Sequence, residues 1–377
     1  MGEWGYFNPV RIACAPGACL RLGEHVAFER MVLVTSPGFR RRGLVDRVAD
    51  ALGARLVGVV DDVKPNPDVL DIDRQADAIH GLSPDAIVGL GGGSSIDTAK
   101  ALARLLAQPS GATLAAHFRD GAPLAPVPAL PVVAIPTTAG TGAEVTPFGT
   151  VWDFEQAKKY SVTGDDLYPA ATILDPELTL GLPSDVTISS GLDAISHAFE
   201  STWNRNATPV TLGLATKSLQ LSIPALPRLK NDPNDLEARR AMMEASLLAG
   251  LAISQTRTAL AHSISYPLTA RFDLPHGIAC SFTLPALLRF NAEADDGRLA
   301  DLARALGFGG VSELAFELES IYLKLEVAAS FRNCVPDDGR VLELLDEMIA
   351  PSRAENNLKN AGPEDISRIV TASLESM

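Results

Sequence analysis

The sequence has few aromatic residues, few cysteines and no long hydrophobic run. Aromatic residues make up 6% of its 377 positions, and its four cysteines form no Cys-x-x-Cys pair. We therefore expect no disulfide framework and no cysteine-ligated zinc site, and a reducing cytoplasm is the expected compartment. Because no stretch of about 18 apolar residues occurs and the N-terminus lacks the pattern of a signal peptide, we also expect no membrane span and no secretion.

Basic residues are in the minority as well. The 32 basic and 46 acidic residues give a net charge of −14 at pH 7, and no long run of Lys or Arg interrupts that balance. Nucleic acid and anionic membranes would be repelled, so the expected partner is a small molecule. At about 100–200 residues per domain, the length predicts two domains.

The first half alternates short runs rich in Val and Ile with segments of helical periodicity. The expected strands are 31–35, 55–60, 86–90 and 132–135, and the expected helices between them include 44–52 and 96–106. This alternation is typical of an α/β layer built on a parallel sheet.

Beyond Pro183 the strand pattern fades, and long segments rich in Ala and Leu follow, such as 237–253 and 310–327. These segments favour helix. Leu182-Pro183-Ser184-Asp185 also offers a helix start. We therefore expect an α/β domain over residues 1–183 and a helical domain over residues 184–377.

A glycine-rich turn lies at the end of one expected strand. In DAIVGLGGGSSIDTAK, residues 85–100, a buried strand runs into Gly91, Gly92 and Gly93, and a helix is expected to begin near Ser94 or Ser95. Such a turn can hold a phosphate, because backbone N–H groups and the helix dipole face it. It matches neither the Rossmann fingerprint nor the P-loop. A tight turn without a ligand is the alternative.

A second loop of small residues, IPTTAGTGAEVT at 135–146, follows the next strand. Hydroxyls and backbone amides on two neighbouring strand ends suit a dinucleotide. A flexible loop without a ligand is the alternative.

Polar residues with metal-ligand chemistry occur in the helical half. Asp193 and His197 are four residues apart, so a helix places both side chains on one face, and His262 and His276 follow later. One carboxylate and three imidazoles suit a first-row divalent ion, Fe²⁺ or Zn²⁺. The alternative is that each histidine is a satisfied core or surface residue.

Taken in order, these motifs resemble those of the iron-containing, or group III metal-dependent, alcohol dehydrogenases. The resemblance covers nearly the full chain and includes GGGSSIDTAK, IPTTAGTGAEVT, GLDAISHAFES and the segment from His262 to Pro285. It implies a dehydroquinate synthase-like fold, with an N-terminal Rossmann-like α/β domain, a helical metal-binding domain and a catalytic metal in the cleft between them. It also implies a homodimer or larger homo-oligomer.

The activity that this resemblance implies is the reduction of an aldehyde or ketone, or the oxidation of an alcohol, with a nicotinamide cofactor. The implied metal ligands are Asp193, His197, His262 and His276. The implied cofactor contacts are residues of the two loops, namely Gly91, Gly92, Gly93, Ser94, Ser95, Asp97, Thr137, Thr138 and Thr141.

Two positions depart from the family pattern. Tyr266 stands four residues after His262, where many members carry a histidine credited with proton transfer, so we expect its phenol to donate a proton or bind substrate. A relay through water or the cofactor ribose is the alternative. Ser36 stands where NAD-specific members carry Asp, and Arg40, Arg41 and Arg42 follow it. We expect NADP(H), with NAD(H) as a second cofactor, since guanidinium pairs well with phosphate. Otherwise these arginines are a solvated helix start.

The substrate is indicated by TRTALAHSISYPLT, which looks most like the branch of the family that reduces phosphonoacetaldehyde to 2-hydroxyethylphosphonate. Arg257, five residues before His262, is the candidate partner of an anionic tail. Alternatively, Arg257 pairs with an acidic residue. Two other functions remain open: a general short-chain alcohol or aldehyde dehydrogenase, and a metal- or nucleotide-binding module without catalysis.

Overall fold

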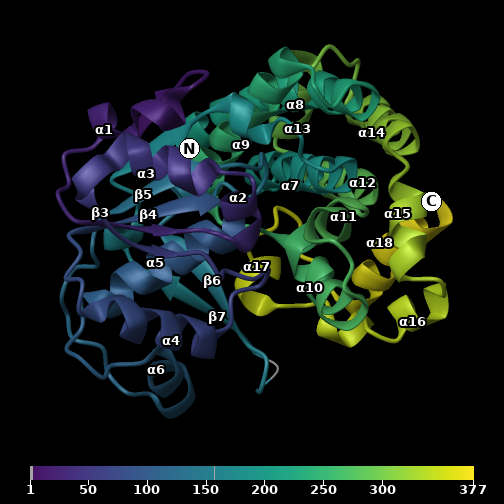
Figure 1. Cartoon of the computed structure of the whole chain (residues 1–377). Helices are drawn as coiled ribbons and strands as arrows, with labels where there is room; N and C mark the ends of the chain where they lie inside the picture. The colour runs from purple at the N-terminus through teal and green to yellow at the C-terminus, as the bar shows by residue number, and fades with distance from the viewer. Residues whose placement is uncertain (1–2, 157) are drawn as a thin grey trace. The chain divides into compact units, whose positions relative to one another are not determined.

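The computed structural model describes residues 3–156 and 158–377 and divides the chain into two compact units. The α/β unit comprises Asn8–Thr138 and Ala143–Thr179, and the helical unit comprises Met1–Phe7, Ala139–Gly142 and Leu180–Met377. In Figure 1 the purple-to-blue part carries the sheet and the green-to-yellow part is made of helices. The predicted combination of an α/β part and a helical part is confirmed.

The α/β unit is built on a six-stranded sheet in which every paired neighbour is parallel. The strand order is β1-β8-β5-β4-β2-β3. The strands are β1 (Arg11–Cys14), β2 (Met31–Val34), β3 (Leu56–Val60), β4 (Ala86–Gly91), β5 (Val132–Pro136) and β8 (Ala171–Leu174). A separate antiparallel hairpin joins β6 (Phe148–Asp153) to β7 (Lys158–Thr163).

Both faces of this sheet are buried, which explains the near-continuous apolar runs. Along β2, Met31 and Leu33 belong to one hydrophobic core, whereas Val32 and Val34 belong to the other. Helices α1 (Leu22–His25), α2 (Pro37–Arg41) and α3 (Leu44–Leu52) cover the first face. Helices α4 (Val69–His80), α5 (Gly93–Leu106) and α6 (Leu114–Asp120) cover the second (Figure 1).

The helical unit is arranged around α7 (Ser184–Thr202), which packs against α8 (Pro209–Asn231), α9 (Leu236–Thr256) and α11 (His276–Ser281). The remaining helices are α10 (Leu260–Phe272), α12 (Leu284–Ala292), α13 (Arg298–Ala305), α14 (Val311–Leu325), α15 (Val327–Cys334), α16 (Asp338–Leu342), α17 (Pro351–Ala354) and α18 (Pro363–Glu375). Every residue of α7 from 191 to 202 is buried. Polar side chains in this stretch therefore need partners inside the protein.

Two expectations about sequence composition can be compared with the structure. Within the described ranges, each helix is too short or too polar to cross a lipid bilayer. All four cysteines are free thiols.

Candidate metal centre

Helix α7 carries three ionisable side chains on one buried face. It begins at Ser184, directly after Pro183, and continues for 19 residues. Asp193, His197 and Glu200 are separated by four and three residues, so one face of the helix presents all of them. All three side chains are buried. Asp193 and His197 were predicted from the sequence. Glu200 was not, although it follows Asp193 by two helical turns and could have been noticed.

Two later helices bring further histidines to Asp193. His262 lies in the first turn of α10, and His276 is the first residue of α11. The distance from Asp193 Oδ1 is 3.5 Å to Nε2 of His197, 3.5 Å to Nε2 of His262 and 3.9 Å to Nε2 of His276. The structure therefore brings the four predicted ligands together, each histidine through the same ring nitrogen.

The cluster is closed on one side and accessible on the other. The side chains of Asp193, His197 and His262 are 5%, 6% and 4% exposed, whereas that of His276 is 39% exposed. The rings of His197 and His262 stack with centroids 4.7 Å apart. A small molecule can therefore reach the cluster beside His276.

The outer nitrogens of two rings are anchored. Nδ1 of His262 lies 2.6 Å from Glu200 Oε2, and the backbone N–H of His262 donates to Oε1 of the same carboxylate at 3.1 Å. Nδ1 of His197 lies 3.2 Å from the carbonyl oxygen of Gly140. Since a carboxylate and a carbonyl only accept, both Nδ1 atoms donate, and Nε2, which faces Asp193, is the atom of each ring that offers a lone pair to a metal once the ring is neutral.

The electrostatics of the metal-free cluster are dominated by its carboxylates. Burial opposes the charged form of Asp193, but the adjacent His197, His276 and His262 lower its pKa. Burial alone would lower the pKa of His262, yet the charges of Glu200 and Asp193 outweigh it and raise that pKa to about 10. Burial lowers the pKa of His197. The two carboxylates therefore favour a positive charge at His262.

The donor set fits a divalent metal. Nε2 of His262 is buried, and among the described residues it has no hydrogen-bond partner. Such an orphaned polar atom is costly unless something binds it. Three imidazoles, two of them anchored, whose Nε2 atoms all face the carboxylate of Asp193 provide the kind of ligands that Fe²⁺ and Zn²⁺ accept.

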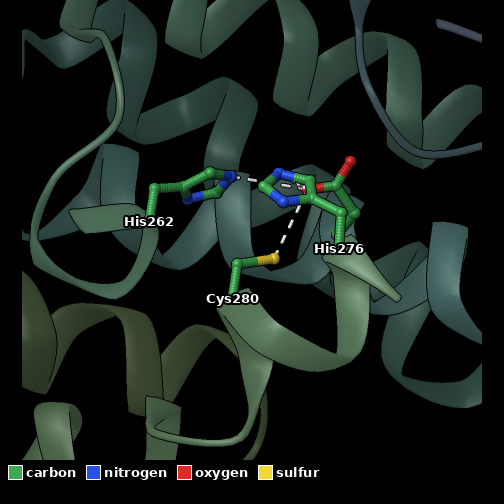
Figure 2. Close-up of side chains that lie close together, drawn as sticks. His262, His276 and Cys280 are labelled. Carbon is green, nitrogen blue, oxygen red and sulfur yellow. Dashed lines mark hydrogen bonds and ion pairs between the residues drawn. The ribbon is translucent and has the colours of Figure 1, made fainter. Parts of the chain in front are cut away.

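Cys280 lies in the same cluster and was not predicted. Figure 2 shows His262, His276 and Cys280 directed toward one another. The ligand atoms of Asp193, His262, His276 and Cys280 all lie within 4.8 Å of one another. The thiol lies 3.5 Å from Asp193 Oδ1, and burial together with Asp193 raises its pKa well above the usual value. His197 stays the predicted fourth ligand, because Gly140 anchors its Nδ1 and its Nε2 faces Asp193 at 3.5 Å.

A glycine allows α11 to approach α7 closely. A Cβ at Gly277 would lie 1.7 Å from the carbonyl oxygen of Ser189. Any side chain there would push α11 away from α7. Gly277 therefore allows α11 to hold His276 in the cluster.

The two other residues predicted near the metal lie in the middle of α10 and directly after α9. Tyr266 is half-buried, one helical turn after His262, and its hydroxyl accepts a hydrogen bond from Nε of Arg353 at 3.1 Å. Arg257 follows α9 with a φ of 64°, and its side chain is exposed. Its role in binding substrate stays a prediction.

In the α/β unit, the glycine turn connects β4 to α5. Gly91 ends β4 with a φ of 150°, and a Cβ there would lie 2.4 Å from Ser95 Oγ. Gly92 is the N-cap of α5 and Gly93 its first residue, so the helix begins slightly earlier than predicted. The N–H of Thr137 donates to the carbonyl oxygen of Gly91 at 3.0 Å, which ties the threonine loop to the turn.

The polar residues of these loops have different surroundings. The hydroxyl of Ser94 accepts from the N–H of Asn66 at 3.3 Å. The carboxylate of Asp97 accepts from the N–H of Thr150 at 2.9 Å, and burial raises its pKa to about 6. Thr138 is half-buried beside Gly92, and Thr141 belongs to the helical unit.

The expected NADP-selecting segment lies at the end of β2. Ser36 is the N-cap of α2. Arg40 forms an ion pair with Asp61, the residue after β3, and Arg42 lies over the ring of Phe39 at 4.4 Å. Part of the positive charge near Ser36 is therefore neutralised by Asp61.

Comparisons with known proteins agree with this architecture. The family model "Iron-containing alcohol dehydrogenase" matches residues 9–176, and "Fe-containing alcohol dehydrogenase family, C-terminal" matches residues 187–374. A phosphonoacetaldehyde reductase from Streptomyces viridochromogenes is 39% identical over 279 residues, which cover 72% of this chain and 69% of that protein. An NAD-dependent methanol dehydrogenase from Bacillus methanolicus is 34% identical, with 80% of each chain covered.

Among solved structures, a sulfoacetaldehyde reductase from Bifidobacterium kashiwanohense in complex with NAD⁺ superimposes with a TM-score of 0.92 at 30% identity, covering 99% of both chains. The fold predicted from the sequence is thus confirmed over the whole chain. Together with the two family models, these likenesses show that the chain belongs to the iron-containing alcohol dehydrogenase family.

Proposed function

We propose that this alcohol dehydrogenase reduces a short aldehyde with an anionic tail to the primary alcohol, the best candidate being phosphonoacetaldehyde. The observation that carries the proposal is the cluster of Asp193, His197, His262 and His276, buried on one side and accessible at His276. The likeness to the Streptomyces phosphonoacetaldehyde reductase supports the anionic tail.

The residues of the helical unit would hold the metal. In the proposed division of labour, residues 184–377 provide the metal site and residues 1–183 bind the dinucleotide. Asp193 and the three histidines are the ligands, while Glu200 and the carbonyl of Gly140 fix the rings of His262 and His197. When bound, the metal supplies a Lewis acid for the carbonyl oxygen, and the nicotinamide supplies the hydride.

Tyr266 is the proposed proton donor to the alcohol oxygen. Its hydroxyl accepts from Arg353, so its own O–H is the group that donates. It lies on α10 one turn from His262, on the same face of the helix. For Tyr266→Phe we expect a lower kcat with the metal retained.

For the cofactor, we propose NADP(H) with NAD(H) as a second choice. Ser36 removes the negative charge that would repel a 2′-phosphate, and the glycine turn at Gly91–Gly93 would hold the pyrophosphate at the start of α5. The ion pair of Arg40 with Asp61 leaves Arg41 and Arg42 as the candidates for the phosphate.

The second candidate is a general alcohol or aldehyde dehydrogenase for uncharged substrates, which is favoured by the likeness to the methanol dehydrogenase. A metal- or nucleotide-binding module without catalysis is the third possibility. Turnover of any aldehyde would exclude it.

The deciding experiment measures NADPH and NADH oxidation by the Fe²⁺-loaded protein with phosphonoacetaldehyde and with propionaldehyde. We expect kcat/KM to favour the phosphonate by about 100-fold or more, roughly 2.7 kcal/mol of transition-state binding. Equal or reversed values would favour the general dehydrogenase, and an absence of turnover with either aldehyde would favour the binding module.

A further inference from the structure

One arginine lies directly beside the proposed proton donor. Arg353 is on α17, and its Nε donates to Tyr266 Oη at 3.1 Å. Four residues separate Tyr266 from His262, which corresponds to a helical rise of about 6 Å. The guanidinium therefore lies next to the helix face that carries a member of the metal cluster.

Three hydrogen bonds attach the segment around α17 to α10 and to the residues just before α10. The hydroxyl of Ser263 donates to the carbonyl oxygen of Met348 at 2.7 Å and accepts from the N–H of Ala350 at 2.7 Å. The amide of Asn356 donates to the carbonyl oxygen of Thr258 at 2.8 Å. Arg353, which lies between these anchors, is thus presented by a fixed piece of backbone.

Arg353 forms no ion pair within the part of the chain that the structure describes. Its side chain is half-buried. Arg271, by contrast, pairs with Glu347 at 3.1 Å, and Arg257 is exposed. With Nε bound to Tyr266, the two Nη groups of Arg353 still present a fork that suits the paired oxygens of a phosphonate.

We propose that Arg353, held beside the reacting carbonyl by its hydrogen bond to Tyr266, binds the oxyanion tail of the aldehyde and selects it over uncharged aldehydes. This inference rests on the proposed function and replaces Arg257 by Arg353 as the residue that recognises the anion. In this arrangement Tyr266 contacts both Arg353 and the substrate. Arg353 then positions the tail, and Tyr266 positions the reacting carbonyl.

The test compares Arg353→Gln, Arg353→Lys, Arg257→Gln and Arg271→Gln, each first checked for metal content and thermal unfolding. Arg271→Gln is the matched control, because it removes the same charge from α10 where Glu347 already neutralises it. Two quantities are measured: the ratio of kcat/KM for phosphonoacetaldehyde to that for propionaldehyde, and the Kd of 2-hydroxyethylphosphonate by calorimetry.

For Arg353→Gln we expect the ratio to fall, and the Kd to rise, by about 100-fold, the effect of two charge-assisted hydrogen bonds. Arg353→Lys should recover part of both because it restores the charge without the fork. If Arg353→Gln keeps the ratio and the Kd, or if Arg257→Gln loses them instead, the assignment is wrong. A wild-type enzyme without any preference for the phosphonate would contradict the proposed function itself.

Discussion

The glycine turn of the α/β unit and the metal cluster of the helical unit are built in opposite ways. The turn depends on absent side chains, since a Cβ at Gly91 would collide with Ser95 only four residues away. The cluster depends on buried side chains drawn from residues 193 to 276, and at least two of its rings need a further partner, Glu200 or Gly140. A turn made of consecutive glycines can therefore be recognised in the sequence. The residues that anchor a cluster of side chains from distant segments cannot.

The largest expected effect separates the proposed ligands from the neighbouring thiol. His262→Ala should abolish metal binding and lower kcat/KM by about three powers of ten or more, because several kcal/mol of charge stabilisation are lost. Cys280→Ser is the matched variant and should keep the metal, because His197 and not Cys280 is the proposed fourth ligand. Metal analysis of both purified proteins checks this. Loss of metal in Cys280→Ser would contradict the choice of His197 as fourth ligand.

The next effect concerns the close packing of α11 on α7 in the helical unit. Gly277→Ala places a Cβ 1.7 Å from the carbonyl oxygen of Ser189 and should destabilise the protein by about 3 kcal/mol, as overpacking does. Gly213→Ala in α8 is the control, because its Cβ would contact nothing within 4 Å. It should be neutral or slightly stabilising. Denaturant titration of both variants measures the difference, and equal stabilities would mean that α11 is not tightly packed on α7.

Removing the charge of Glu200 should weaken the metal site without dismantling it. For Glu200→Gln we expect metal affinity to fall by about 10–100-fold, because Gln can accept from Nδ1 of His262 but carries no charge. In the wild type, Glu200 and Asp193 raise the pKa of His262 to about 10, so the metal must displace a proton below that pH. Metal affinity should therefore rise with pH.

Calorimetry at about pH 8 in buffers of different ionisation enthalpy should show release of about one proton per metal in the wild type. Glu200→Gln should release fewer, because the pKa of His262 moves back toward its ordinary value. Identical proton release would show that Glu200 does not control the charge of His262.

The smallest effect returns to the α/β unit. Gly91→Ala should weaken NADPH binding by about 10-fold through strain at a φ of 150° and contact with Ser95, while the metal content stays unchanged. Fluorescence titration with NADPH measures it. A loss of metal in this variant would mean that the glycine turn and the metal cluster are not independent.

Sequence periodicity was sufficient for the strands that are rich in Val and Ile. The predicted runs at 31–35, 55–60, 86–90 and 132–135 correspond to β2, β3, β4 and β5. β1 was missed because it is largely exposed, and β8 because it begins with Ala171 and Thr172, so neither produces a run rich in Val and Ile. Their pairing is a tertiary event that local propensity does not encode.

For the site, the sequence provided the ligand types and one helical spacing. The meeting of His262 and His276 with Asp193 follows from the packing of α10 and α11, which periodicity does not specify. Cys280 and Glu200 could have been noticed at helical spacings from His276 and Asp193. The contact of Arg353 with Tyr266 spans 87 residues of sequence and needed the fold.

The most direct test of the central claim is the absorption spectrum of the metal-free protein titrated with Co²⁺. The account predicts binding of one ion per chain with the intense d–d bands of a four-coordinate nitrogen and oxygen site. It predicts no thiolate-to-cobalt charge-transfer band, because Cys280 is not among the proposed ligands. Failure to bind Co²⁺, or a thiolate charge-transfer band, would contradict the assignment of Asp193, His197, His262 and His276 as the metal ligands.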